Sequence, residues 1–508
     1  MLRGVDDRRG RLRGLTTLTI ALLLVVTSCH RSSGERVASA KTEPAPPPIQ
    51  LLATAKVVAP WKGDLDAMAQ RRTIRCAVTL TRTSYFLDGT RQRGATYELL
   101  RGLQKFINRE RHTKTLQINV IAVPTARNQL LPSLREGRVD IAAANLTITP
   151  EREKLVDFTE PFYDNAREIV VTGPGAPELP DLAALGGRRV MVRRSSSYWT
   201  DLERLNQRLK AEGKPAVKLV AMPEVLETED ILELTNAGAV TITVADDYLA
   251  DLWAKVFPNI TLHPDLALRD HGRIAWAIRK DSPQLKAMLD RFVRSHRAGT
   301  LTGNVLIKRY FKNTRWISNP IDTTSEAKLE RLRPIFDRYA KEYGFDPLMV
   351  MALAYQESGL DQSKRSHVGA VGIMQLLPTT AADPNVGIPD ITTVEANIHA
   401  GTKYLRFLRD RYFSDPAIDP LNAELFTFAA YNAGPARIAK LRAEAARMGL
   451  DPNRWFDNVE VVAAKRIGRE TVRYVANIVR YSVAFDLGHA QVALKNRALG
   501  RDLKDRSS

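Results

Sequence analysis

The sequence predicts a multidomain protein in which an α/β domain is followed by an all-α domain. Its 508 residues are enough for two or three domains of ordinary size. From about residue 70, apolar segments of strand length alternate with amphipathic segments of helix length. After about residue 326 only helical patterns follow. This order favours an α/β architecture with parallel strands first and a helical domain second.

The N-terminus, residues 1–28, has the pattern of a signal peptide rather than of folded structure. Arginines precede twelve mostly apolar residues, 15–26, which are too few to span a bilayer comfortably. Residues 26–29, VTSC, resemble a bacterial lipoprotein lipobox, which implies that Cys29 is lipidated. His30 stands where the usual inner-membrane retention signal has Asp. We therefore expect the protein to be anchored at the periplasmic face of the outer membrane of a Gram-negative bacterium. A cleaved secretion signal or an uncleaved anchor is the alternative.

Residues 29–69 are predicted to be a tether, because prolines gather at 44–48 and core-forming patterns are few. The formal charge of +18 suits an anionic neighbourhood such as a phospholipid surface or a wall polymer, although an Arg-rich proteome would give the same excess. No basic patch interleaved with aromatic residues points to nucleic acid. With Cys29 lipidated, Cys76 is alone and is predicted to be a buried strand thiol.

The α/β part is predicted from five consecutive segments. Their hydrophobic periods alternate between those of strands and helices. The predicted strands are 75–80, 117–123 and 139–145, and the predicted helices between them are 97–108 and 128–136.

Residues 142–162, AAANLTITPEREKLVDFTEPF, closely resemble the signature of the periplasmic amino-acid-binding proteins, solute-binding family 3. The resemblance covers about 70–300 and implies two lobes that close over a ligand. The first lobe would hold about 70–170 and 270–300, and the second about 175–265. Further segments fit the same family, namely 94–100, 190–198, 244–246 and 285–299.

This resemblance also implies a ligand site. Arg152 would pair with the α-carboxylate of an amino acid, since a planar guanidinium matches a carboxylate bidentately. Asn145 and Thr147 align with ligand-contacting positions. Ser196 lies where a helix opens whose N–H groups would meet the same carboxylate. Asp246 aligns with the acid that takes the α-amine.

Two features leave the identity of the ligand undecided. Tyr85 or Phe86 is expected to cover the ligand's side chain, and a core role is equally open for both. Ser195 stands where the family usually has Gly, and Thr241 where it usually has an acid. An amino acid or a wall-derived peptide would each satisfy a pair such as Arg152 with Asp246.

Residues 301–326 are predicted to link the two domains and to pack, since they keep Tyr310, Phe311, Trp316 and Ile317. The all-α domain, 327–508, then follows. Its predicted helices are 328–343, 347–357, 394–412, 422–431 and 469–487.

One of these helices carries a candidate general acid. Asp346 can cap it, Pro347 suits its first position, and eight apolar residues from 348 to 355 predict burial all round. Glu357 lies at its far end, on a stripe with apolar side chains. Desolvation there would raise the pKa of Glu357, as a general acid requires. The alternative is a solvated Glu at a frayed helix end.

Four downstream segments complete a pattern with Glu357 and Ser358. Together they resemble the lytic transglycosylases with the goose-type-lysozyme-like fold. The segments are SHVGAVGIMQ at 366–375, NIHAGTKYL at 397–405, AAYNAGP at 429–435 and ETVRYV at 470–475. The resemblance implies a carbon–oxygen lyase that cleaves peptidoglycan between N-acetylmuramic acid and N-acetylglucosamine. It also implies an all-α lysozyme-like domain behind the two-lobed periplasmic-binding-protein-like domain.

The motifs supply one convincing acid, whereas glycosidases usually need two carboxylates. Asp361 lies past the helix end and Glu470 reads as a helix-start carboxylate. The family's reaction fits a single acid, because the muramoyl C6 hydroxyl attacks within the molecule and closes a 1,6-anhydro ring. Glu357 would give a proton to the glycosidic oxygen and take one from that hydroxyl. A hydrolytic muramidase, or a receptor that only binds wall, are the competing hypotheses.

Supporting roles follow from the same resemblance. Ser366, Gln375 and Asn432 would bind acetamido groups or orient Glu357. Met374 and Tyr431 would offer surface to sugar rings, with a core role as the alternative. Tyr474 would reach Glu357 with its hydroxyl, unless it is simply a buried tyrosine. No metal or cofactor is implied. The pairing of domains suggests regulation of the enzyme by the small ligand.

Overall fold

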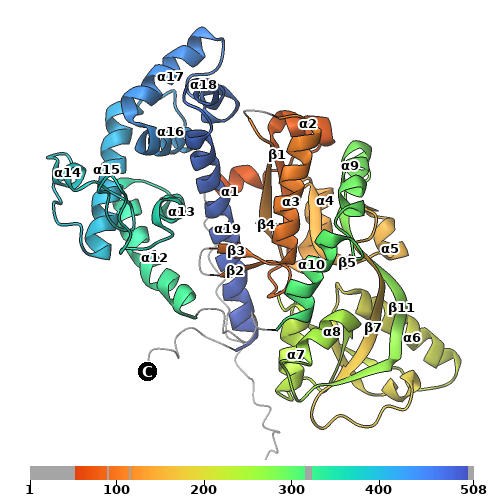
Figure 1. The fold of residues 1–508 in the computed structure, drawn as a ribbon. Coiled ribbons are helices and arrows are strands. Elements are labelled where there is room, and N and C mark those ends of the chain that lie inside the picture. The colour runs from red at the N-terminus through yellow and green to blue at the C-terminus, as the bar shows by residue number, and fades with distance from the viewer. Residues whose placement is uncertain (1–51, 89–90, 114–115, 315–322, 501–508) are drawn as a thin grey trace, which may run out of the picture. The chain divides into compact units, whose positions relative to one another are not determined.

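The computed structural model describes residues 52–88, 91–113, 116–314 and 323–500 (Figure 1). Residues 50–508 form one compact unit. Predictions for the signal peptide, for Cys29 and for the first part of the tether fall outside the described residues. The rest of the predicted tether is partly folded, because α1 (Leu52–Val57) and α2 (Leu65–Arg71) lie within it. Ala53 of α1 joins the core of the helical part.

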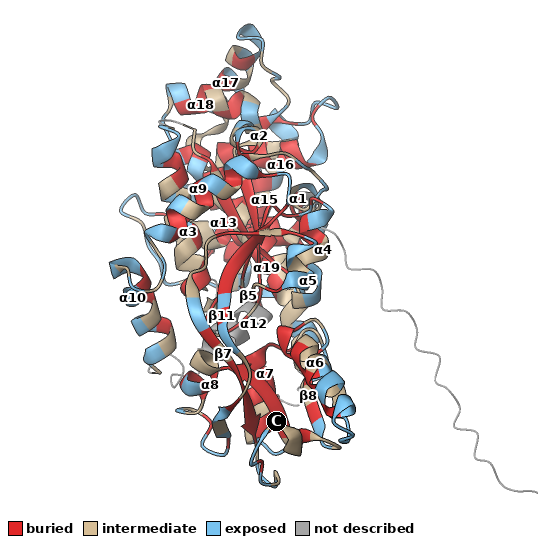
Figure 2. Cartoon of the chain, turned by 90° about the vertical axis from the view of Figure 1, so that its right-hand side faces the viewer, coloured by how far each residue is buried: buried red, intermediate tan, exposed pale blue. Residues whose placement is uncertain are grey.

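The α/β part is built on one mixed sheet. Its strands run in the order β10 (Ile242–Asp246), β7 (Tyr163–Thr172), β11 (Thr261–Ile278), β5 (Ile141–Thr147), β1 (Thr73–Val78) and β4 (Asn119–Pro124). The three predicted strands, β1, β4 and β5, pair in parallel as expected. The later strands pair antiparallel, which the prediction of parallel strands missed. Buried segments of β7 and β11 are visible in Figure 2.

The buried residues of the α/β part form separate clusters in each of the two expected lobes. In the first lobe the buried Cys76 of β1 confirms the predicted strand thiol. The other helices and small strands of the first lobe are β2 (Phe86–Asp88), β3 (Arg91–Arg93), α3 (Ala95–Glu110), η1 (Arg127–Gln129), α4 (Leu130–Arg135), α5 (Pro150–Glu153), β6 (Asp157–Phe158) and α9 (Pro283–Arg294). The second lobe adds η2 (Leu182–Leu185), β8 (Arg189–Arg193), α6 (Ser197–Ala211), β9 (Lys218–Met222), α7 (Thr228–Asn236) and α8 (Asp247–Trp253).

The segment after the lobes packs, as its aromatic residues predict. It forms α10 (Leu301–Ile307) and η3 (Lys308–Lys312). Leu306 and Tyr310 bury themselves against Ala95 at the start of α3. Trp316 and Ile317 lie outside the described residues.

The rest of the described chain is helical. Two helices, α13 and α16, are buried on every side over most of their length. The elements are α12 (Thr323–Tyr343), α13 (Pro347–Ser358), α14 (Pro378–Ala382), α15 (Val394–Tyr412), α16 (Pro420–Ala433), α17 (Pro435–Arg447), η4 (Trp455–Val459), α18 (Glu460–Arg466) and α19 (Glu470–Ala498).

The last helix, α19, extends well past its predicted end at residue 487. Val483 belongs to a core cluster of the first lobe, and Leu499 packs beside a cluster of the second. Near its start, Tyr474 belongs to the core of the helical part. One helix therefore joins the helical part to both lobes of the α/β part.

Candidate active site and ligand pocket

Glu357 lies in the last turn of α13, and the local sequence explains why the helix ends there. Asp346 caps the start by accepting a hydrogen bond from the Leu348 N–H at 2.9 Å. Gly359 adopts a left-handed conformation, φ +71°, and stops the helix. The Glu357 side chain is half-buried rather than solvated at a frayed end.

The carboxyl of Glu357 is held by α19. The Tyr474 hydroxyl, itself buried, donates a hydrogen bond to Glu357 Oε1 at 2.5 Å. Burial raises the pKa of Glu357 above its ordinary value, while the Tyr474 hydrogen bond and the Lys364 charge pull it down by less. The pKa of Glu357 is therefore shifted in the predicted direction. The predicted contact between the Tyr474 hydroxyl and Glu357 is also present.

A second tyrosine lies close to the same carboxyl. Burial, and then the charge of Glu357, raise the pKa of Tyr431 well above its ordinary value. Its hydroxyl donates to the Met374 carbonyl at 2.7 Å. Tyr431 thus connects α16, the Glu357 side chain and the loop that carries Met374 and Gln375.

That loop is fastened to the end of α13. The Lys364 ammonium donates to the backbone carbonyl of Glu357 at 2.5 Å. The Gln375 side-chain amide donates to the Gly372 and Lys364 carbonyls at 2.8 and 3.2 Å. Gln375 therefore positions the loop beside the acid. Lys364 was missed by the sequence reasoning, and its place three residues after Asp361 gave no signal for it.

Three predicted residues serve the scaffold in this structure. The Ser366 hydroxyl accepts the Ala370 N–H at 2.9 Å and closes a turn. Asn432 Oδ1 accepts the Thr471 hydroxyl at 2.8 Å, which ties α16 to α19. Met374 is 0 % exposed and belongs to the core, so the expectation that it offers surface to a sugar ring is wrong. An apolar side chain in such a loop can face either the solvent or the core, and here it packs into the core.

The other two carboxylates that were considered from the sequence point to solvent. Asp361 and Glu470 are both exposed. Glu470 is the first residue of α19, as predicted for a carboxylate at the start of a helix. Glu357 is thus the acid of these motifs that combines partial burial with a raised pKa.

Gly372 should be far more sensitive to substitution than Gly369. Both have positive φ, +80° and +86°, which costs a non-glycine residue roughly 1–2 kcal/mol. At Gly372 a Cβ would also lie 2.5 Å from Asn397 Nδ2, whereas at Gly369 it would meet nothing within 4 Å. Asn397 cannot retreat easily, because it accepts the Met374 N–H at 2.8 Å. Gly372→Ala should therefore lower the melting temperature by several degrees more than Gly369→Ala in calorimetry. Equal shifts would contradict this packing.

A pocket lies between the two lobes, with about 40 Å³ of free space. Five of the six predicted ligand residues line it, namely Asn145, Thr147, Arg152, Ser196 and Asp246. Tyr85 does not, because it is 0 % exposed and its hydroxyl donates to Gln92 Oε1 at 2.9 Å within the first lobe. The core role that was open for Tyr85 is the one the structure shows.

Arg152 is engaged by the chain itself. Its two terminal nitrogens donate to the carbonyls of Thr147, at 2.8 Å, and Ser195, at 3.0 Å. Burial, and then the charge of Arg127, lower the pKa of Arg152 to about 10. Its guanidinium therefore connects the lobes and also lines the pocket between them.

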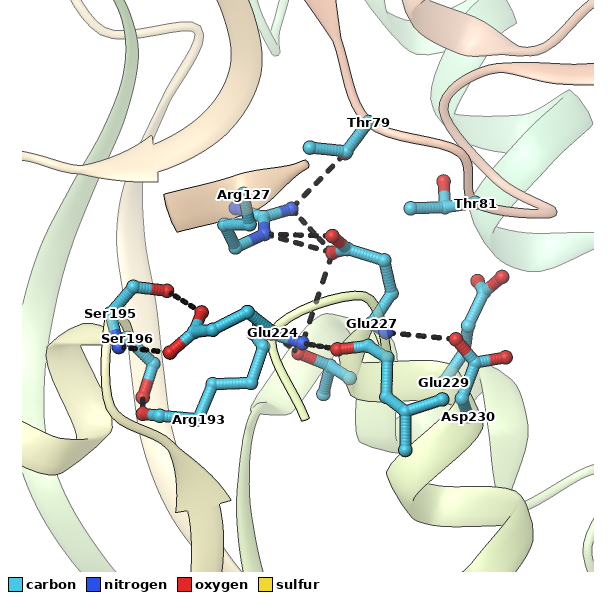
Figure 3. Close-up of polar contacts among 12 residues, drawn as sticks. Thr79, Thr81, Arg127, Arg193, Ser195, Ser196, Glu224, Glu227, Glu229 and Asp230 are labelled. Carbon is cyan, nitrogen blue, oxygen red and sulfur yellow. Dashed lines mark hydrogen bonds and ion pairs between the residues drawn. The ribbon is translucent and has the colours of Figure 1, made fainter. Parts of the chain in front are cut away.

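The sequence reasoning missed the ion pair that crosses the pocket. Arg127 of the first lobe binds Glu227 of the second, with Nη2 and Oε2 2.7 Å apart (Figure 3). Both residues line the pocket. Arg127 could have been found by its place after β4, since polar residues at the carboxyl ends of parallel strands face the ligand crevice.

Two family models match this chain, one in the α/β part and one in the helical part. The family model of the bacterial extracellular solute-binding proteins, family 3, matches residues 86–313. The transglycosylase SLT domain matches residues 334–451. A solved ancestral arginine-binding protein bound to arginine is 21% identical, with a TM-score of 0.39, over 47% of this chain and 99% of its own.

Two curated relatives carry the same description, "Membrane-bound lytic murein transglycosylase F". The protein of Desulfosudis oleivorans is 30% identical over 78% of this chain and 86% of its own length. That of Methylobacillus flagellatus is 30% identical over 77% of this chain and 80% of its own. The similarity thus spans the α/β part and the helical part together.

Proposed function

The chain belongs to the membrane-bound lytic murein transglycosylase F family, and from this premise we propose that Glu357 is its single catalytic acid and base. The enzyme is a peptidoglycan lytic transglycosylase. It cleaves the bond between N-acetylmuramic acid and N-acetylglucosamine without water and leaves 1,6-anhydro ends. The observation that carries the role of Glu357 is its partly buried carboxyl, held by Tyr474 at 2.5 Å, with a raised pKa.

The reaction needs two proton transfers through that carboxyl. Protonated Glu357 gives its proton to the glycosidic oxygen as the bond to the muramoyl C1 breaks. The resulting carboxylate takes the proton of the muramoyl C6 hydroxyl as its oxygen bonds to C1. The acid is thereby restored, and no water enters the products. An internal nucleophile has an effective concentration on the order of 10⁵ M or more, so a second carboxylate is not required.

Mass analysis of digested sacculi tests this proposal. Lytic cleavage gives muramoyl ends that are lighter by one water than those from hydrolysis. We expect 1,6-anhydro ends from the purified enzyme. Ordinary reducing ends would favour the hydrolytic muramidase instead, and an unaltered sacculus would favour a receptor that only binds wall.

The expected site of action is the periplasmic face of the outer membrane. The support is the lipobox-like sequence ending at Cys29 and the membrane-bound description of the relatives. Over the described residues, none of the helices has the length and apolar character needed to span a bilayer. Cys29→Ser should release the enzyme from the membrane fraction, and continued fractionation with the outer membrane would oppose the lipid anchor.

A small ligand, either an amino acid or a wall-derived peptide, is proposed to control the enzyme from the pocket. The support is α19, which carries Tyr474 at one end and Lys495 near the other. Lys495 binds Asp230 of the second lobe at 2.8 Å. The same Asp230 oxygen accepts the N–H of Glu227, which lines the pocket. A shift at Glu227 thus has a continuous route to Glu357.

Lys495→Met should weaken the response of the enzyme to its ligand. The ammonium would no longer bind Asp230, so lobe movement would be transmitted less to α19. The measurement compares turnover of sacculi with and without stem peptides released by an amidase. Lys440→Met, at an exposed position on α17, is the matched control. An identical response in the parent enzyme and both variants would remove this route.

A further inference from the structure

A cationic surface lies where α3 of the first lobe meets α19 of the helical part. Arg480 of α19 donates from Nη1 to Gln104 Oε1 of α3 at 3.1 Å, and from Nη2 to Asn477 Oδ1 on its own helix. Arg101 lies one turn before Gln104 on the same face of α3. This surface, the α3–α19 seam, consists of three neighbouring residues on each helix: Tyr97, Arg101, Gln104, Asn477, Arg480 and Tyr481.

The seam carries positive charge without a carboxylate partner. Both acceptors of Arg480 are neutral amide oxygens, and over the described part of the chain neither Arg480 nor Arg101 forms an ion pair. Burial lowers the pKa of Arg480, and the charge of Arg101 lowers it as well, although Tyr97 and Tyr481 oppose them. The half-buried Arg480 thus loses hydration and is repelled by a second cation, two costs that a bound anion would offset.

Other arginines at the joints of this chain are paired with its own acids. Arg72 of the first lobe binds Glu460 of α18, and Arg127 binds Glu227 across the lobes. Both of those carboxylates are buried. Arg480 holds a comparable place between the first lobe and the helical part, yet its partners supply no charge. The seam therefore lacks the anion that each of the other two joints contains.

Enough N–H groups remain at the seam to hold a carboxylate. A guanidinium has five N–H groups, and the two hydrogen bonds of Arg480 use two of them. Arg101 is exposed and makes no hydrogen bond with the described residues. Two guanidinium groups with free N–H groups can bind a carboxylate through paired hydrogen bonds, the geometry that suits arginine best.

The seam lies close to the candidate acid. Asn477 Nδ2 donates to Gln356 Oε1 at 3.2 Å, and Gln356 precedes Glu357 on α13. Arg480 follows Tyr474 by six residues, which is about 9 Å along the helix axis. In Figure 1, α19 runs between α13 and α3. A substituent of the sugar that Glu357 acts on therefore needs a length of about 10 Å to meet the seam.

We propose that the α3–α19 seam binds a carboxylate of a stem peptide carried by the glycan strand, with Arg101 and Arg480 as its cationic residues. The inference rests on the proposed function and adds a specificity to it, because strands that bear peptides would be preferred to bare strands. Stem peptides are attached to the lactyl group of muramic acid and carry carboxylates. An extended tripeptide spans about 10 Å, which matches the required length. None of the six seam residues lines the pocket between the lobes.

Kinetics of the full chain in detergent on two glycan substrates test the proposal. One substrate consists of soluble strands with uncross-linked stem peptides, and the other is the same material after an amidase has removed the peptides. We expect the parent enzyme to have the lower KM on the strands that bear peptides. Arg101→Met should raise that KM about three- to fivefold, as expected for the loss of one exposed ion pair. The preference, taken as the ratio of the two KM values, should fall in the same proportion.

Further variants grade this effect. Arg101→Glu should lower the preference more than Arg101→Met, because the new carboxylate repels those of the peptide. Arg480→Gln should also lower it, and if this variant does not fold, the two Arg101 variants decide. Lys210→Met is the matched control, since it removes one positive charge from an exposed position on α6 of the second lobe. It should keep the preference of the parent enzyme.

Two results would overturn the proposal. One is a parent enzyme with equal KM values on both substrates, or a preference that is unchanged in both Arg101 variants. The other is a KM that rises equally on both substrates in Arg101→Met. Bare strands keep the lactyl carboxylate, so an equal rise would show that the seam does not recognise the peptide.

Binding of both substrates to the Glu357→Gln protein, measured by calorimetry, separates this site from the catalysis. If strands with peptides bind no more tightly than bare strands while the parent enzyme yields 1,6-anhydro ends, the seam proposal is wrong and the proposed catalysis stands. If they bind more tightly, and Arg101→Met removes the difference, while the parent enzyme yields ordinary reducing ends, the catalysis is wrong and the seam stands.

Discussion

Replacing Glu357 with glutamine should reduce the formation of 1,6-anhydro ends by about 10³-fold or more, since general acid and general base catalysis each contribute about 10²–10⁴-fold. The amide has the same shape as the acid and can still accept the Tyr474 hydrogen bond. It cannot give a proton to the glycosidic oxygen, nor take one from the C6 hydroxyl. Both steps of the reaction therefore fail at once, while the fold is kept.

Liquid chromatography with mass detection of muropeptides measures the effect, and calorimetry checks the fold. Glu470→Gln is the matched control, because Glu470 is an exposed carboxylate in the same set of motifs. It should keep nearly full activity. A Glu357→Gln enzyme with a rate near that of the parent would show that another group carries the proton.

Tyr474→Phe should slow the enzyme about ten- to a hundredfold, because a hydrogen bond to a charged group contributes roughly 1.5–3 kcal/mol. The phenol donates to the Glu357 carboxyl and thereby stabilises its charged form. Without that donor the pKa of Glu357 rises further. The enzyme needs Glu357 protonated to start the reaction, so the alkaline limb of the rate profile should move to higher pH.

The pH dependence of kcat and KM on soluble glycan fragments measures this shift. Tyr431→Phe provides the contrast, because the Tyr431 hydroxyl donates to the Met374 carbonyl and not to the acid. It should slow the reaction through the loop and leave the alkaline limb in place. A limb that stays fixed in Tyr474→Phe, or moves to lower pH, would contradict the role given to this hydrogen bond.

The helix that carries Glu357, α13, was predictable from the sequence because local interactions define it. Asp346, Pro347 and Gly359 delimit α13 by capping and backbone preference, which depend on the nearest residues alone. The continuous apolar run from 348 to 355 required burial on all sides. That burial is also the cause of the raised pKa of Glu357.

Contacts distant in sequence were not predictable in the same way. The pairing of Arg127 with Glu227 joins residues whose separation depends on how the two lobes close. The hydrogen bonds from Ser195 to Glu224 form only when the ends of two different strands, β8 and β9, lie side by side. Periodicity likewise cannot tell whether Met374 and Tyr85 face a ligand or the core, because both choices satisfy an apolar side chain.

The length of α19 was also not predictable from the sequence pattern. Its motif, ETVRYV, lies at the start of the helix, but the helix continues to Ala498, past the predicted end at 487. The last turns are stabilised instead by partners in the second lobe, such as Asp230 for Lys495. Their helical state follows from tertiary contacts, which sequence periods do not report.

Digestion of sacculi in water enriched in ¹⁸O tests most directly whether one carboxyl and an internal hydroxyl suffice. The account predicts muramoyl products in the 1,6-anhydro form that carry no ¹⁸O, because the C6 oxygen of the sugar itself closes the bond to C1. Reducing ends that carry one ¹⁸O at C1 would show that water is the nucleophile, and would contradict the account.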